Sequence, residues 1–229
     1  MKSLNLLALL FFFTGPLLAQ QKLIPSEANI EDATLREFLA NLATAVDEKN
    51  KEFIISNLSQ QMKNSFGGDG GIEEFKQYWS WDSDPSGFWS LMEKLLSLGG
   101  GKVRHESSYS IPYVFTDWRD VEHDPFEYMA ITGADINVRE KPEAGAKVLG
   151  QLSYDIVKVD YGKSSPPFSS PKLKGVKYIG PKEWYFVETL DGDISGFVNW
   201  NYIWSPIDYR IGFYKLDGKW VISYLLAGD

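Results

Sequence analysis

The chain has 229 residues, no cysteine and a formal net charge of −8 at pH 7. Without cysteine it has no disulfide, no thiol nucleophile and no residue for lipid attachment at a cleavage site. An acidic surface repels phosphate groups, so we expect neither nucleic acid nor an anionic membrane surface as a partner. The length allows one or two domains with hydrophobic cores of their own.

Residues 1–19 have the layout of a secretory signal peptide. Lys2 precedes the apolar run from Leu4 to Phe13, a Gly15-Pro16 break follows, and Ala19 supplies the small residue of a cleavage site. A membrane span needs about 20 uninterrupted apolar residues, and the polar residues after Ala19 come too early for one. We therefore expect cleavage near Ala19 and a periplasmic or secreted protein with no stable membrane insertion.

The next part of the chain reads as helical. Thr34 and Glu37 fit a capping box, and the apolar residues between Leu35 and Val46 recur at helical spacing, so this helix buries one face. Shorter helices are expected over residues 51–58, 72–79 and 87–98. Residues 103–115 are β-branched and aromatic, which predicts one or two strands.

From Tyr128 onward the pattern changes to short strands separated by turn residues. The ordered landmarks are Asn137-Val138-Arg139 before Pro142; Val148, Gly150 and Leu152; Ile156 to Val159; Trp184 to Val187; and Gly196-Phe197-Val198 before Tyr202-Ile203. This series resembles the bacterial SH3 domain family, which implies an SH3-like β-barrel over residues 128–206. Phe197 stands where the family usually has Trp. The insertion from Tyr161 to Lys182 lengthens one loop, which can either block or build a groove.

The C-terminal residues from Tyr209 to Leu226 alternate as strands around Asp217-Gly218, a type I′ turn signal. A lone hairpin is marginal in water, and the N-terminal helices need a sheet to cover. We therefore expect residues 25–127 and 207–229 to form one α+β host domain, with helices on an antiparallel sheet and the all-β barrel inserted between the two segments. The closing hairpin also resembles NTF2-like or cystatin-like folds. The alternative is two consecutive domains with a tail that extends the barrel.

Residues that could carry catalysis are few. His105 and His123 lie beside carboxylates, but neither has metal-ligand spacing. Nucleophile elbow, phosphate-loop and dinucleotide motifs do not occur in the sequence. We expect no enzymatic activity, no cofactor and no metal.

Aromatic residues supply the candidate binding sites. Trp81 lies among other rings close to Asp84, and rings beside carboxylates suit a sugar or a peptide. On the expected barrel the candidate rings are Tyr154, Tyr161, Trp200 and Tyr202.

The family resemblance implies that the barrel rings converge on a peptide groove. The implied partner is a cell-wall peptide, such as a peptidoglycan stem peptide, or an envelope protein. The alternative function is a small-ligand pocket or weak acid/base chemistry in the α+β domain, with the barrel as a spacer or lid.

Overall fold

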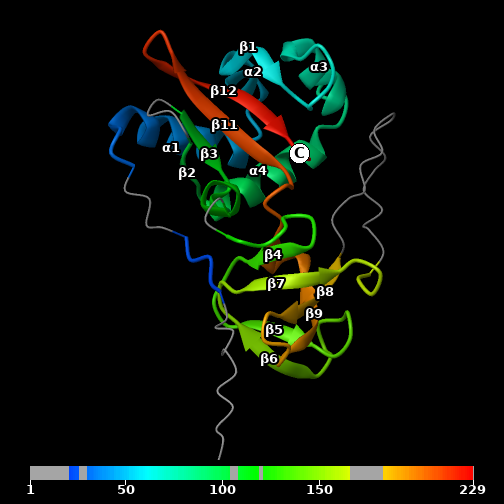
Figure 1. The fold of residues 1–229 in the computed structure, drawn as a ribbon. Helices are drawn as coiled ribbons and strands as arrows, with labels where there is room; N and C mark the ends of the chain where they lie inside the picture. The colour runs from blue at the N-terminus through cyan, green and yellow to red at the C-terminus, as the bar shows by residue number, and fades with distance from the viewer. Residues whose placement is uncertain (1–20, 26–29, 104–107, 119–120, 166–182, 229) are drawn as a thin grey trace, which may run out of the picture.

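The structure is a computed structural model that describes residues 21–25, 30–103, 108–118, 121–165 and 183–228. The expected signal peptide and His105 lie outside these residues. The chain forms a mixed α/β structure with two sheets, one above the other in Figure 1. No helix within the described ranges has the length and apolar character to cross a membrane.

Five helices accompany the upper sheet: α1 (Ala33–Asp47), α2 (Lys51–Ser56), α3 (Gly71–Tyr78), α4 (Ser86–Leu98) and α5 (Tyr113–Asp117). The capping box expected at Thr34 and Glu37 is wrong, because the N-cap of α1 is Asp32. Its Oδ1 atom accepts the backbone N–H groups of Thr34 at 2.8 Å and Leu35 at 3.2 Å. The Thr34 hydroxyl donates to the same oxygen at 2.6 Å instead of capping the helix itself.

The upper sheet has five strands in the order β1-β12-β11-β3-β2. Their bounds are β1 (Leu58–Lys63), β2 (Gly101–Lys102), β3 (Ser108–Ile111), β11 (Arg210–Leu216) and β12 (Lys219–Leu226). The expectation of an antiparallel sheet is wrong at β1, which pairs parallel with β12. The helix expected to reach Leu58 ends at Ser56, and the chain turns directly into this strand with Leu58 and Met62 buried.

The C-terminal hairpin has the expected turn. Asp217 and Gly218 join β11 to β12 with φ values of 49° and 81°, the two positive angles that a type I′ turn requires. Of the one or two strands predicted over residues 103–115, the structure has β3, and the chain then forms the short helix α5.

Strands from both ends of the described chain share the upper sheet, and α1 and α4 pack against it (Figure 1). The Phe38 ring of α1 meets Phe213 of β11 edge-on, with 5.7 Å between ring centroids. The Trp220 indole N–H donates to Thr34 Oγ1 at 3.1 Å. Segments that are far apart in sequence therefore bury one common core.

The lower sheet has seven strands in the order β10-β4-β7-β8-β9-β5-β6. Their bounds are β4 (Tyr128–Ile131), β5 (Ile136–Arg139), β6 (Val148–Leu152), β7 (Ile156–Asp160), β8 (Trp184–Thr189), β9 (Ser195–Asn199) and β10 (Ile203–Trp204), with the 3₁₀ turn η2 (Trp200–Tyr202) before β10. In the described part of the chain β10 and β6 are the two ends of this order, so the strands do not close into a complete barrel.

Side chains of the lower sheet enter the core of the upper one. Ala130, Ile156 and Trp204 belong to the same buried cluster as the helices. The Lys94 ammonium of α4 lies 6.0 Å from the centre of the Trp204 ring and donates to the Asn201 carbonyl. The two sheets are therefore joined by packing as well as by the chain.

Residues 21–23 run along the lower sheet beside β7. The Leu23 N–H donates to the Tyr154 carbonyl at 2.7 Å, and the Ile156 N–H donates to the Gln21 carbonyl at 2.8 Å. Lys22 pairs with the buried Asp155 at 2.9 Å. Leu23 then enters the upper core, so this segment fastens the two sheets together.

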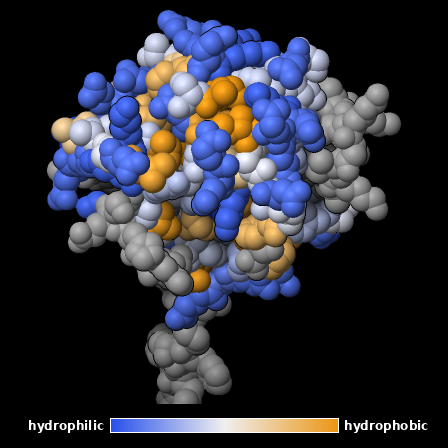
Figure 2. Space-filling model, turned by 90° about the horizontal axis from the view of Figure 1, so that it is seen from above, coloured by the Kyte–Doolittle hydropathy of each residue, from blue (hydrophilic) through white to orange (hydrophobic). Residues whose placement is uncertain are grey.

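The surface agrees with the acidic, polar composition. The end of the molecule that is uppermost in Figure 1 is mostly hydrophilic, with a few hydrophobic residues near its centre (Figure 2).

Candidate functional site

A hollow of about 540 Å³ lies on the lower sheet, where the start of β5, the start of β8 and η2 come together. We refer to it as the Tyr202 hollow. Its lining residues are Ala134, Asp135, Ile136, Asn137, Arg139, Ala144, Trp184, Asn199, Asn201 and Tyr202.

One wall is the turn that ends β9. Asn199 Oδ1 accepts the N–H of Asn201 at 3.1 Å, and this bond closes the tight turn η2. The carbonyl of Tyr202 accepts the Thr132 N–H at 2.9 Å, which fixes the backbone at this residue. The Tyr202 ring remains 48% exposed, so a fixed backbone presents a free aromatic face.

The opposite wall is polar. Asp135 has a φ of 54° and donates its N–H to Ser153 Oγ at 2.8 Å. The Arg139 guanidinium donates to the Ala146 carbonyl at 2.7 Å. Trp184, which is only 6% exposed, provides an apolar wall in the same hollow. Amide, carboxylate and guanidinium groups around an aromatic ring can hydrogen-bond a peptide backbone and stack on a side chain.

A second hollow, of about 410 Å³, lies on the same sheet and shares no lining residue with the first. We refer to it as the Phe126 hollow. It is lined by Phe126, Glu127, Lys158, Val159, Asp160, Tyr161, Lys163, Phe186 and Glu188.

The four candidate rings of the lower sheet do not converge. Tyr202 lines one hollow and Tyr161 lines the other. Trp200 is half-buried against the core of the seven-stranded sheet. Tyr154 is also half-buried, and its backbone carbonyl accepts the Leu23 N–H. A single groove made by all four rings is therefore not formed.

The aromatic candidate in the upper part is a core residue. Trp81 is 3% exposed and lies between Phe75, Phe88 and Trp89, with ring centroids 5.1 to 5.5 Å away. The rings meet because α3 ends and α4 begins on either side of this turn, and together they close the core. Stacking of a sugar or peptide on Trp81 is therefore excluded by burial.

Asp84 is exposed, and its Oδ1 atom accepts the Ser86 N–H at 3.0 Å. This bond organises the turn that leads into α4. With Trp81 buried, Asp84 has no exposed ring of that cluster beside it, and the two residues do not form the site expected from their spacing.

Sequence analysis did not propose Asp135, Arg139 or Phe126 as binding residues. Arg139 ends the Asn137-Val138-Arg139 landmark and Asp135 precedes it, and only the folded chain places both in the same hollow as η2. The sequence does contain a feature that could have indicated an exposed ring at Phe126, because this apolar residue lies within the acidic stretch from Glu122 to Glu127.

His123, the one histidine that the structure describes, lies in neither hollow. The His123 ring stacks on Tyr128 with 4.5 Å between centroids, and its carbonyl accepts the Trp118 indole N–H at 3.2 Å. Across the residues that the structure describes, no three His, Cys, Asp or Glu side chains are grouped so that they could hold a metal ion. Burial raises the pKa of the Tyr161 hydroxyl, so this ring stays neutral at physiological pH.

Comparison with known proteins gives no relative, since the chain matches no protein-family model, no curated protein and no solved structure. The proposal of a function therefore rests on the chemistry of the two hollows.

Proposed function

We propose that this chain is an exported cell-envelope protein whose lower sheet is an SH3-like module, inserted in an α+β host, that binds a peptide without catalysis. The expected ligand is a peptidoglycan stem peptide or a peptide segment of an envelope protein. Support for the module comes from the landmark residues, which fall in chain order on β5 to β10 with a 3₁₀ turn before the last strand.

The observation that carries the proposal is the Tyr202 hollow. An exposed ring on a fixed turn faces a polar wall across a space of about 540 Å³, which is within the usual size of a ligand site. Asn201 lines the same hollow, and an amide side chain can both donate to and accept from a peptide backbone. A ring held in place by its backbone loses little conformational entropy when a ligand packs on it.

The test is binding of the secreted protein to purified peptidoglycan and to a synthetic stem peptide. Tyr202→Ala should weaken binding about tenfold or more, because an exposed aromatic at the centre of a site is the usual source of binding energy. For the stem-peptide titration, which contains no sugar, Tyr161→Ala is the matched control, since it removes a similarly exposed ring from the other hollow.

Two results would contradict the proposal. The wild-type protein would show no retention on peptidoglycan and no saturable binding of stem peptide. Alternatively, Tyr202→Ala would bind as tightly as wild type while Tyr161→Ala lost binding.

A further inference from the structure

The Phe126 hollow is built by the outward face of two paired strands. Asp160 of β7 lies opposite Phe186 of β8, and Lys158 lies opposite Glu188. Val159 points to the inside of the sheet, where it is buried. The alternation of strand side chains thus places charged groups and one ring on the open face.

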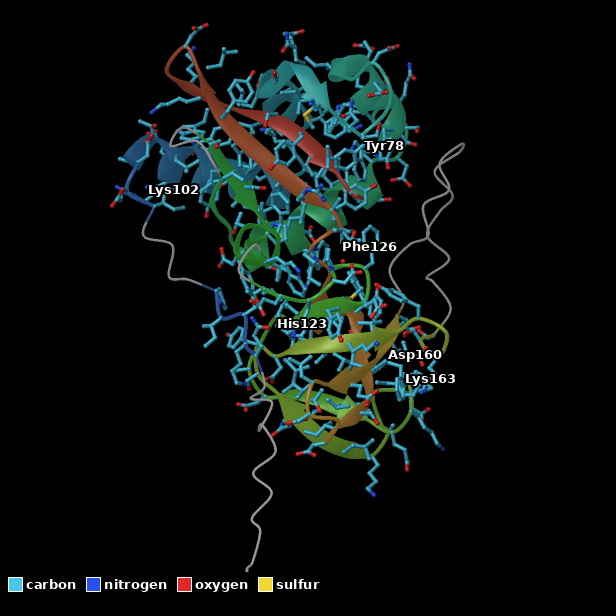
Figure 3. The ribbon with its side chains drawn as sticks, viewed as in Figure 1. Tyr78, Lys102, His123, Phe126, Asp160 and Lys163 are labelled. Atoms are coloured by element: carbon cyan, nitrogen blue, oxygen red, sulfur yellow. The ribbon has the colours of Figure 1, made fainter. Side chains whose placement is uncertain are left out.

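The loop before β4 completes the hollow. The Val159 N–H donates to the Glu127 carbonyl at 2.9 Å, which holds this loop against β7. Phe126 and Tyr161 lie at the edges with 55% and 43% of their surface exposed. Figure 3 shows Asp160 and Lys163 together at the end of β7, with Phe126 above them toward the upper sheet.

Both ammonium groups in this hollow are paired with carboxylates, and Glu188 is a third carboxylate in the lining. Lys158 lies 3.3 Å from Glu127, and Lys163 lies 3.3 Å from Asp160. The Glu127 carboxylate raises the pKa of Lys158, and the backbone N–H of Lys163 followed by its ammonium lowers the pKa of Asp160, so both pairs stay charged at neutral pH. An anionic ligand would meet three carboxylates and would have to separate one of these pairs to reach an ammonium group. A neutral ligand rich in hydroxyl groups can donate to the carboxylates and accept from the ammonium groups without separating either.

The two exposed rings complete this chemistry. The Lys163 ammonium covers the Phe186 ring at 4.6 Å, so that ring is occupied by the protein itself. Phe126 and Tyr161 keep open faces, and the Tyr161 ring is steadied by an edge contact with Tyr185 at 6.4 Å between centroids. Aromatic faces of this kind bind the apolar face of a ligand whose edges are polar.

We propose that the Phe126 hollow is a second binding site, and that it takes a neutral oligosaccharide built of pyranose rings. Each pyranose has a C–H face that stacks on Phe126 or Tyr161 and an edge of hydroxyl groups for the paired carboxylates and ammonium groups. The site is independent of the peptide site, because no residue lines both hollows. The chain would then hold a peptide and a glycan at separate places on one sheet.

The experiment is calorimetric titration of the secreted protein with two soluble probes, chitotetraose and maltotetraose. These differ both in the acetamido group and in the glycosidic linkage, which is β-1,4 in chitotetraose and α-1,4 in maltotetraose, so they cover two distinct kinds of neutral sugar. At least one probe should bind saturably, and Phe126→Ala and Tyr161→Ala should each weaken that binding about tenfold. Tyr202→Ala should bind the sugar as wild type does.

All variants change exposed side chains, and thermal melts should show that they fold like wild type. The inference is overturned if neither sugar binds saturably, if both ring variants bind as wild type does, or if Tyr202→Ala loses sugar binding. Because the stem-peptide test depends on Tyr202, failure of the peptide proposal leaves the sugar result unaffected, and the reverse also holds.

Discussion

At the residue scale, Gly100 shows how closely the chain is packed beside β3. A Cβ atom at this position would lie 1.9 Å from the Ser110 carbonyl oxygen, far inside van der Waals contact. That oxygen belongs to the backbone of a strand that pairs with both β2 and β11, so it cannot move without disturbing the sheet. Glycine is therefore required here for space.

We predict that Gly100→Ala lowers the free energy of unfolding by about 3 kcal/mol, the upper part of the range for overpacking. Gly87→Ala is the matched control, because Gly87 lies in α4 with no atom within 4 Å of a new Cβ. Alanine favours helix over glycine by about 0.5 to 1 kcal/mol, so this variant should be neutral or more stable. Urea denaturation measures both, and equal stability of the two variants would contradict the packing at Gly100.

Burial at the residue scale also separates two of the candidate rings, Trp81 and Tyr202. Composition identifies an aromatic residue, but burial depends on what the fold places next to it. Trp81 and Tyr202 both sit near polar residues in the sequence, yet one is 3% exposed and the other 48%. The difference arises because Trp81 is enclosed by α3 and α4, while Tyr202 stands on a turn at the edge of the sheet.

At the element scale, Asp32 joins α1 to the C-terminal hairpin. Its carboxylate caps the helix and also pairs with Lys215 of β11 at 2.9 Å. The hydrogen bond from the Thr34 hydroxyl, followed by that from Lys215, holds the pKa of Asp32 far below its ordinary value of 3.8. The ionised form is therefore the one that stabilises the folded chain.

This lowered pKa predicts how stability changes with acid. A carboxyl whose pKa is depressed by folding stabilises the protein above the pKa of the unfolded chain and loses that effect as pH falls toward the folded pKa. Asp32→Asn keeps a capping oxygen but removes the charge, so it should melt a few degrees below wild type above about pH 5. The gap should narrow steadily below about pH 4.

The control for this pH series is Glu31→Gln. Glu31 pairs with Lys102 at 3.2 Å, but both side chains are exposed, and such pairs contribute little to stability. Its melting temperature should follow wild type throughout. If the difference in melting temperature between wild type and Asp32→Asn stays constant or widens in acid, the stabilising role of the ionised Asp32 carboxylate is contradicted.

Local patterns predicted the elements whose signals lie within a few residues. Helical spacing indicated α1, and Asp217-Gly218 indicated the hairpin of β11 and β12. Strand β1 was not predicted. Its consecutive polar residues Gln60 and Gln61 interrupt the alternation of apolar and polar residues that indicates a strand, and its partner β12 lies far away in the sequence. The parallel pairing is a property of the assembled sheet.

At the scale of the whole molecule, the two sheets are fastened in more than one place. Residues 21–23 bind the bend before β7 and place Leu23 in the upper core, while Lys94 of α4 donates to Asn201. This second contact lies next to Tyr202. We infer that α4 supports the turn that presents the exposed ring.

The candidate site could be predicted only in part. The resemblance to SH3-like barrels made Tyr154, Tyr161, Trp200 and Tyr202 binding candidates, and the structure places Tyr202 and Tyr161 in hollows. The sequence could not separate them into two hollows, since that division depends on which strand edges meet in the folded sheet. Asp135 and Arg139 reach the Tyr202 hollow only because β5 pairs with β9 just before η2.

The most direct test of the proposed peptide site is a nuclear magnetic resonance titration of the isotope-labelled protein with the stem peptide. The account predicts that the amide signals that move are those of residues 134–139 and 199–202, with those near Phe126 unchanged. Shifts centred on Phe126 and Tyr161, or no shifts at saturating peptide, would contradict it.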